Sequence, residues 1–159
     1  MKTVQITEDV VLKAHSEASP KGRTLLENLF SDSVFKKDIK ERVKTFADVL
    51  METGNDESIF NEDCEGLPKD EIAYRKLKLI TKALNEDWTP DWSNGKWDKW
   101  FPWFDFDDSS SAGRFSFVGA GGQSSDSGVG SRLCFKSQEL ATYAGTQFEG
   151  LYRDCFVIE

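Results

Sequence analysis

Residues 132–152 have the sequence RLCFKSQELATYAGTQFEGLY, and this stretch decides the fold. A short apolar run ends at Phe135, as expected of a β-strand, and Ser137 follows as a side chain suited to capping a helix. The predicted helix continues to about Tyr152 and carries apolar residues on one face: Leu140, Ala141, Ala144, Phe148 and Leu151. A strand that leads directly into such a helix predicts a helix folded back on a sheet.

The N-terminal half is predicted to consist of short helices. Thr7 can cap a first helix, and Pro20 suits the first turn of a second. Thr45 and Asp48 have the spacing of a capping box, and Gly54 is placed to end the helix that the box begins.

The clearest helical signal follows Pro68. Residues 55–66 are rich in carboxylates and predict a solvated loop or a one-turn helix. After Pro68, acidic residues occupy the first turn, lysines 76, 78 and 82 face outward, and the predicted buried stripe consists of Ile72, Leu77, Ile80, Ala83 and Leu84.

The chain changes character after the long helix. Residues 88–106 contain all five tryptophans together with turn signals, which predicts loop and short strand. Phe115 to Phe117 predict a strand, with residues 132–135 as its partner and the glycine-rich residues 119–130 as a mobile loop between them. Cys155 to Ile158 are predicted to form a last strand.

These elements predict an α+β fold, in which a helical N-terminal half packs with a small antiparallel sheet and a C-terminal helix. The length of 159 residues suits one core, so we expect a single domain over residues 1–159. Its helical part spans about residues 7–86, and its aromatic β part with the C-terminal helix spans about residues 88–159.

The charge balance disfavours two classes of partner. A formal net charge of -8 opposes both nucleic-acid phosphates and anionic membrane surfaces, which require clustered Lys and Arg. No apolar run has the length of a signal peptide or a membrane span, so we expect the chain to stay in the cytoplasm.

No catalytic residue, metal ligand or cofactor is predicted. Gly119, Gly121 and Gly122 suggest a phosphate-binding loop, but Ser124 stands where the dinucleotide motif has its third glycine. His15 is the only histidine and has no recognisable catalytic partner. The three cysteines form no CxxC pair and are expected to be free thiols.

The aromatic segment supplies the candidate binding residues. Indole rings beside carboxylates could recognise a sugar or a partner protein, and the candidates are Trp92, Trp97, Trp100, Asp91, Asp98 and Arg132. The same aromatic residues could instead fill the interior of a small domain. Solvent exposure of the indoles distinguishes these alternatives.

Several passages carry a resemblance: Arg42–Phe46, Asp70–Tyr74, Ala83–Glu86 with Trp88, Pro90 and Asp91, Phe101–Phe104, Gly130–Ser137, Glu139–Ala141, Tyr143–Gly145 and Gln147–Phe148. In these the chain resembles a family of small uncharacterised proteins of gut bacteria, their prophages and other mobile elements. The resemblance implies a phage or mobile-element context, in a bacterial cytoplasm or associated with a virion. It implies no activity and no catalytic residues.

Three functional hypotheses follow. The first is a non-enzymatic interaction or structural protein, whose partner protein contacts the aromatic segment and the glycine-rich loop. The second is a carbohydrate-binding module in which an exposed tryptophan stacks on a sugar ring. The third is an enzyme whose carboxylates and Arg132 form a site without a recognisable motif, which a pocket with converging charges would support.

Overall fold

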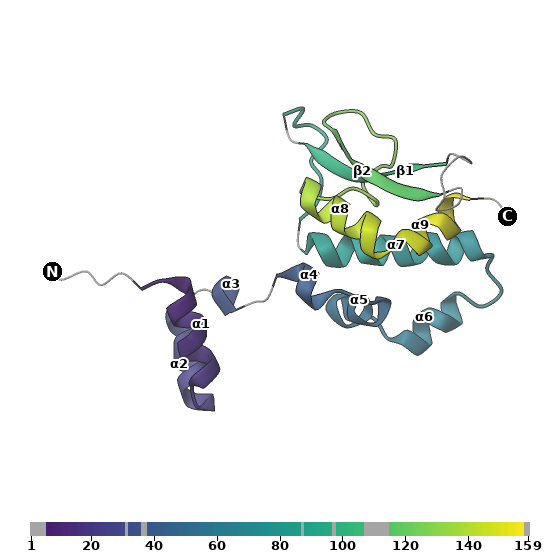
Figure 1. Ribbon diagram of the computed structural model, residues 1–159. Coiled ribbons are helices and arrows are strands. Elements are labelled where there is room, and N and C mark those ends of the chain that lie inside the picture. The colour runs from purple at the N-terminus through teal and green to yellow at the C-terminus, as the bar shows by residue number, and fades with distance from the viewer. Residues whose placement is uncertain are drawn as a thin grey trace. The chain divides into compact units, whose positions relative to one another are not determined.

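The computed structural model describes residues 6–30, 32–35, 38–86, 88–96, 98–106 and 115–157. Its contacts divide the chain into two compact units, Met1–Asp38 and Ile39–Glu159, and each is described by itself (Figure 1). That the whole chain forms one domain stays a prediction.

The first unit contains three helices: α1 (Glu8–Glu17), α2 (Pro20–Leu29) and α3 (Asp32–Phe35). Pro20 begins α2 as predicted, and the Ser19 hydroxyl accepts a hydrogen bond from the Gly22 N–H. His15 Nε2 lies 2.8 Å from Glu27 Oε1, and the His15 ring lies 4.5 Å from that of Phe35. The only histidine of the sequence therefore ties α1 to its neighbours in this unit.

The second unit begins with four helices: α4 (Ile39–Arg42), α5 (Phe46–Thr53), α6 (Glu57–Asp63) and α7 (Lys69–Asn85). The capping box is confirmed, because the Thr45 side chain accepts from the Asp48 N–H while the Asp48 carboxylate accepts from the Thr45 N–H. Gly54 ends α5 with φ +68°, a conformation that favours glycine. The predicted stripe of α7 is buried at Leu77, Ile80, Ala83 and Leu84, whereas Ile72 is half-buried.

The sheet is an antiparallel hairpin of β1 (Lys99–Asp105) and β2 (Ser116–Gln123). The predicted pairing of Phe115–Phe117 with residues 132–135 is therefore wrong, because β2 pairs with the aromatic segment. Residues 119–123, predicted to belong to a mobile loop, lie in β2.

The glycines of β2 make room for the aromatic rings of β1. Phe101 pairs with Gly121, where an added Cβ would lie 2.8 Å from Phe101 Cζ. Trp100 pairs with Gly122, where an added Cβ would lie 3.4 Å from the Trp100 ring. An aromatic ring that covers a glycine replaces the cross-strand contact that the missing side chain would make. The glycine-rich sequence of β2 is thus compatible with a strand, since the aromatic side chains of β1 fill the space beside its glycines.

The C-terminal helix is interrupted. Ser137 caps α8 (Gln138–Gln147) through the Leu140 N–H, as predicted, but Phe148 leaves the helical conformation and α9 (Glu149–Phe156) follows. The predicted strand from Cys155 to Ile158 is wrong for Cys155 and Phe156, which belong to α9. The break redirects the chain, so that α8 packs on the hairpin while α9 packs on α7.

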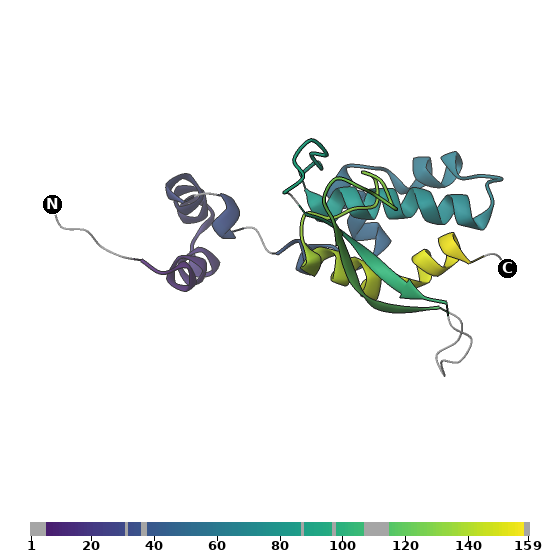
Figure 2. The same cartoon turned by 90° about the horizontal axis from the view of Figure 1, so that it is seen from above.

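The layers of the second unit follow from these contacts. Figure 1 shows the hairpin along one side of α8, with α7 beside α8 and α9, and Figure 2 shows the same arrangement from above. One buried core joins the layers and includes Leu77, Leu84, Phe104, Phe135 and Tyr152. The fold is α+β, as predicted. Along the described ranges, none of the helices combines the length and apolarity that crossing a bilayer requires.

Gly145 sets how closely α8 approaches the hairpin. It is buried, and an added Cβ would lie 2.4 Å from Phe117 Cδ2 and 2.8 Å from Pro102 Cβ. Gly150, on α9, is exposed and has no atom within 4 Å of such a Cβ.

We expect Gly145→Ala to destabilise the protein by about 1 to 3 kcal/mol, because the new methyl group forces α8 away from the hairpin. Gly150→Ala is the matched control and should stabilise α9 by about 0.5 to 1 kcal/mol through helix propensity alone. Urea denaturation followed by tryptophan fluorescence measures both. Equal stabilisation by the two substitutions would contradict the close packing at Gly145.

Candidate functional site

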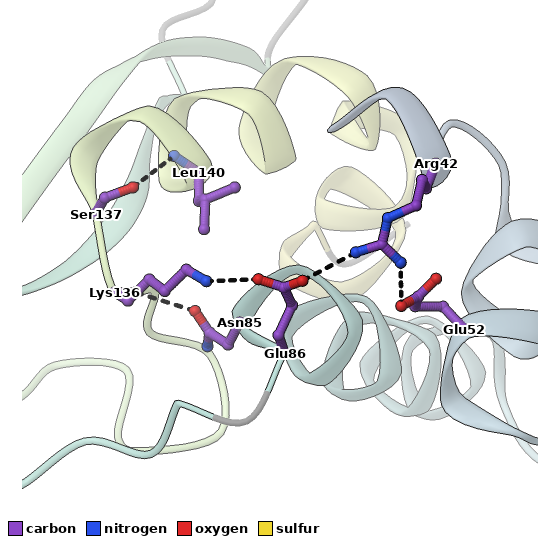
Figure 3. A network of polar contacts seen from close by, with 7 residues as sticks. All are labelled: Arg42, Glu52, Asn85, Glu86, Lys136, Ser137 and Leu140. Atoms are coloured by element: carbon purple, nitrogen blue, oxygen red, sulfur yellow. Dashed lines mark hydrogen bonds and ion pairs between the residues drawn. The ribbon is translucent and has the colours of Figure 1, made fainter. Parts of the chain in front are cut away.

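A buried asparagine organises one end of α7. The Asn85 side chain donates from Nδ2 to the carbonyl oxygen of Cys134 at 2.8 Å. It accepts from the Lys136 N–H at 3.0 Å, a contact that Figure 3 shows. Phe135, between these two residues, exchanges two backbone hydrogen bonds with Trp100 of β1. The asparagine therefore connects α7, through residues 134–136, to the hairpin.

Glu86 lies next to Asn85 and joins three segments. Its carboxylate pairs with Arg42 of α4 at 2.9 Å and with Lys136 at 3.0 Å, and Arg42 also pairs with Glu52 of α5 (Figure 3). Glu86 has φ +54°, which is unusual for a residue other than glycine. Such a conformation persists only where surrounding contacts hold it, and the two ion pairs supply those contacts.

A pocket of about 450 Å³ lies beside this network. Its charged lining residues are Lys78, Lys82, Arg132 and Glu86, and the remaining ones are Leu79, Thr81, Asn85, Trp88, Thr89, Pro90 and Ser131. We call it the cationic pocket, because three of these side chains are cations and its one carboxylate, among the described lining residues, is paired with Arg42 and Lys136. Of the predicted site residues that the structure describes, this pocket contains Arg132 alone.

The other predicted residues that the structure describes do not line this pocket. Asp91 and Asp98 are exposed, Trp92 and Trp100 are half-buried, and Trp97 lies outside the described residues. The Ser93 hydroxyl and N–H donate to the Asp91 carboxylate and hold the pKa of Asp91 below its ordinary value. The five described residues of this set therefore do not line one pocket together.

Lys99 explains why Trp92 is half-buried. The Lys99 side chain is buried, and its Nζ donates to the carbonyl oxygens of Asn94 at 3.3 Å and Ser124 at 2.7 Å. The ammonium also lies 5.0 Å from the centre of the Trp92 ring, while Trp92 Nε1 donates to the Ser131 hydroxyl at 2.6 Å. Lys99 therefore joins the loop that contains Asn94 to the loop that contains Ser124.

A second hollow, of about 280 Å³, lies on the hairpin. Its lining is apolar apart from the indole N–H of Trp103 and consists of Phe101, Pro102, Trp103, Phe104, Phe106, Val129 and Phe156. We call it the apolar groove. Trp103 is 59% exposed, Phe106 53% and Phe156 39%, so large apolar side chains face solvent there. Sequence reasoning chose other tryptophans; the signal that favours Trp103 is strand alternation, which turns it away from its buried neighbours Pro102 and Phe104.

The described residues offer few groups for covalent chemistry. Burial raises the pKa of the Cys134 thiol, and burial together with Asp70 and Glu71 raises that of Cys155. Both shifts disfavour the thiolate that a nucleophile requires. Within the described ranges, no three or more His, Cys, Asp and Glu side chains gather in a group that could hold a metal ion.

Comparisons with known proteins add no relative: no family model, curated protein or solved structure matches the chain.

We expect Lys99→Met to destabilise the protein by about 1 to 3 kcal/mol, because two carbonyl oxygens lose their buried donor. Lys96→Met is the matched control, since Lys96 is exposed in the same segment, and it should change stability by less than about 0.5 kcal/mol. Chemical denaturation compares the two variants. If Lys99→Met were as stable as Lys96→Met, Lys99 would not fasten the loops.

Proposed function

We propose that the chain is a non-enzymatic interaction protein of phage or mobile-element origin, and that it binds a partner protein through the apolar groove. The observation that carries this proposal is the solvent exposure of Trp103, Phe106 and Phe156 around one apolar hollow. Contiguous exposed apolar surface on a folded protein is typical of an interaction site. The groove combines the aromatic segment with Val129 of the glycine-rich stretch.

The lining favours a polypeptide as the occupant. A sugar requires polar groups that pair with its hydroxyls, and none of the groove's lining residues has a polar side chain other than the indole of Trp103. Apolar side chains of a partner protein, by contrast, require only a groove of complementary shape and enough apolar surface to bury. Aromatic residues such as Trp103 are also those that most often dominate the binding energy of protein interfaces.

The carbohydrate alternative has weaker support from the described residues. The Lys99 ammonium occupies one side of the Trp92 ring, and Trp92 Nε1 already donates to Ser131. Trp100 packs against the buried core. These contacts cover part of each indole.

Display selection of peptides on the wild-type protein tests the proposal. We expect enrichment of peptides with aromatic and aliphatic residues, and binding of purified peptides should weaken roughly 30-fold, about 2 kcal/mol, on Trp103→Ser. The fold should remain intact, because the indole is mostly exposed.

Met51→Ser is the matched control, since Met51 is 75% exposed on α5 and lies outside the groove. It should leave peptide binding unchanged. Selected peptides that bind wild type and Trp103→Ser equally well would refute the groove as the binding site. So would light scattering that shows a wild-type dimer abolished by Trp103→Ser, because the occupant would then be a second copy of the chain.

A further inference from the structure

The cationic pocket has a charge opposite to that of the whole chain. The sequence carries a formal net charge of -8, yet Lys78, Lys82 and Arg132 line one pocket. Glu86 does not offset them, because its carboxylate is paired with Arg42 and Lys136. A concave site lined by cations concentrates positive potential and attracts anions.

The walls between these charges are mostly apolar. Trp88, Pro90 and Leu79 line the pocket, and Trp88 is half-buried there. An indole ring provides a face on which a flat, conjugated group can stack. The pocket volume of about 450 Å³ also suits a small organic molecule, since pockets for such ligands usually measure about 300 to 1,000 Å³.

The geometry points to a binding site for a small aromatic anion, in which a phosphate or carboxylate faces Lys78, Lys82 and Arg132 and the aromatic body lies against Trp88. This site shares no lining residue with the apolar groove. Its test is therefore independent of the test for a partner protein.

Nuclear magnetic resonance titration of the full chain tests the site with phenyl phosphate, adenosine 5′-monophosphate and 1-naphthoate. Inorganic phosphate and 1-naphthol serve as ligands that lack the aromatic body or the charge. We expect the aromatic anions to bind more tightly than either, with shifts centred on residues 78–90 and 131–132. Comparison of the naphthoate and phosphate arms identifies the anion that is preferred.

Matched variants test which residues contact the bound anion. Lys82→Gln and Arg132→Gln should each weaken binding about tenfold, the change expected when one charge-assisted hydrogen bond is lost. Lys96→Gln and Arg153→Gln remove exposed cations outside the pocket and should leave binding unchanged.

Thr81→Val is a further control. It should leave binding unchanged, because Thr81 Oγ1 is fully buried and cannot be reached from the pocket. Absence of localised shifts at millimolar concentrations of every aromatic anion would overturn the proposal. Equal weakening by the pocket and control substitutions would overturn it too, because binding would then reflect general charge.

Discussion

The second unit depends on the pair of hydrogen bonds that Asn85 makes with Cys134 and Lys136. A primary amide has the donor and acceptor of a peptide group, so at the end of α7 it can pair with an extended segment much as a neighbouring strand would. Because the site is buried, losing the amide would leave a carbonyl and an N–H without partners, which is costly away from water. Residues 134–136 are thereby held at a defined place on α7.

Both candidate binding surfaces follow from that placement. Phe135 pairs with Trp100 and so fixes the start of β1, whose later residues line the apolar groove. On the other side of the same contact, Glu86 and Arg132 line the cationic pocket. Ser137 begins α8 immediately afterwards, and Gly145 then lets that helix lie close against the hairpin. One local contact thus positions a helix, a hairpin and two surfaces that differ in charge.

The sequence predicts well those features that local chemistry determines. The capping box at Thr45, the cap at Ser137 and the buried stripe of α7 depend on residues a few positions apart, and all are present. The pairing of β2 and the position of Lys99 depend on contacts between distant residues, which no short pattern encodes. The apolar groove and the cationic pocket are each lined by segments that are distant in the sequence. The sequence therefore indicated Arg132 but not the other residues that line the cationic pocket with it.

Native-state hydrogen exchange of Asn85→Ala tests this account most directly, with Asn61→Ala, an exposed asparagine on α6, as the control. Loss of the contact should accelerate exchange of the Trp100 and Phe135 amides by roughly 10- to 100-fold, the equivalent of about 1 to 3 kcal/mol. The Leu77 amide in the middle of α7 should change less, and Asn61→Ala should change none of the three. Unaltered protection of Trp100 and Phe135 in Asn85→Ala would contradict the claim that this side chain holds the hairpin to α7.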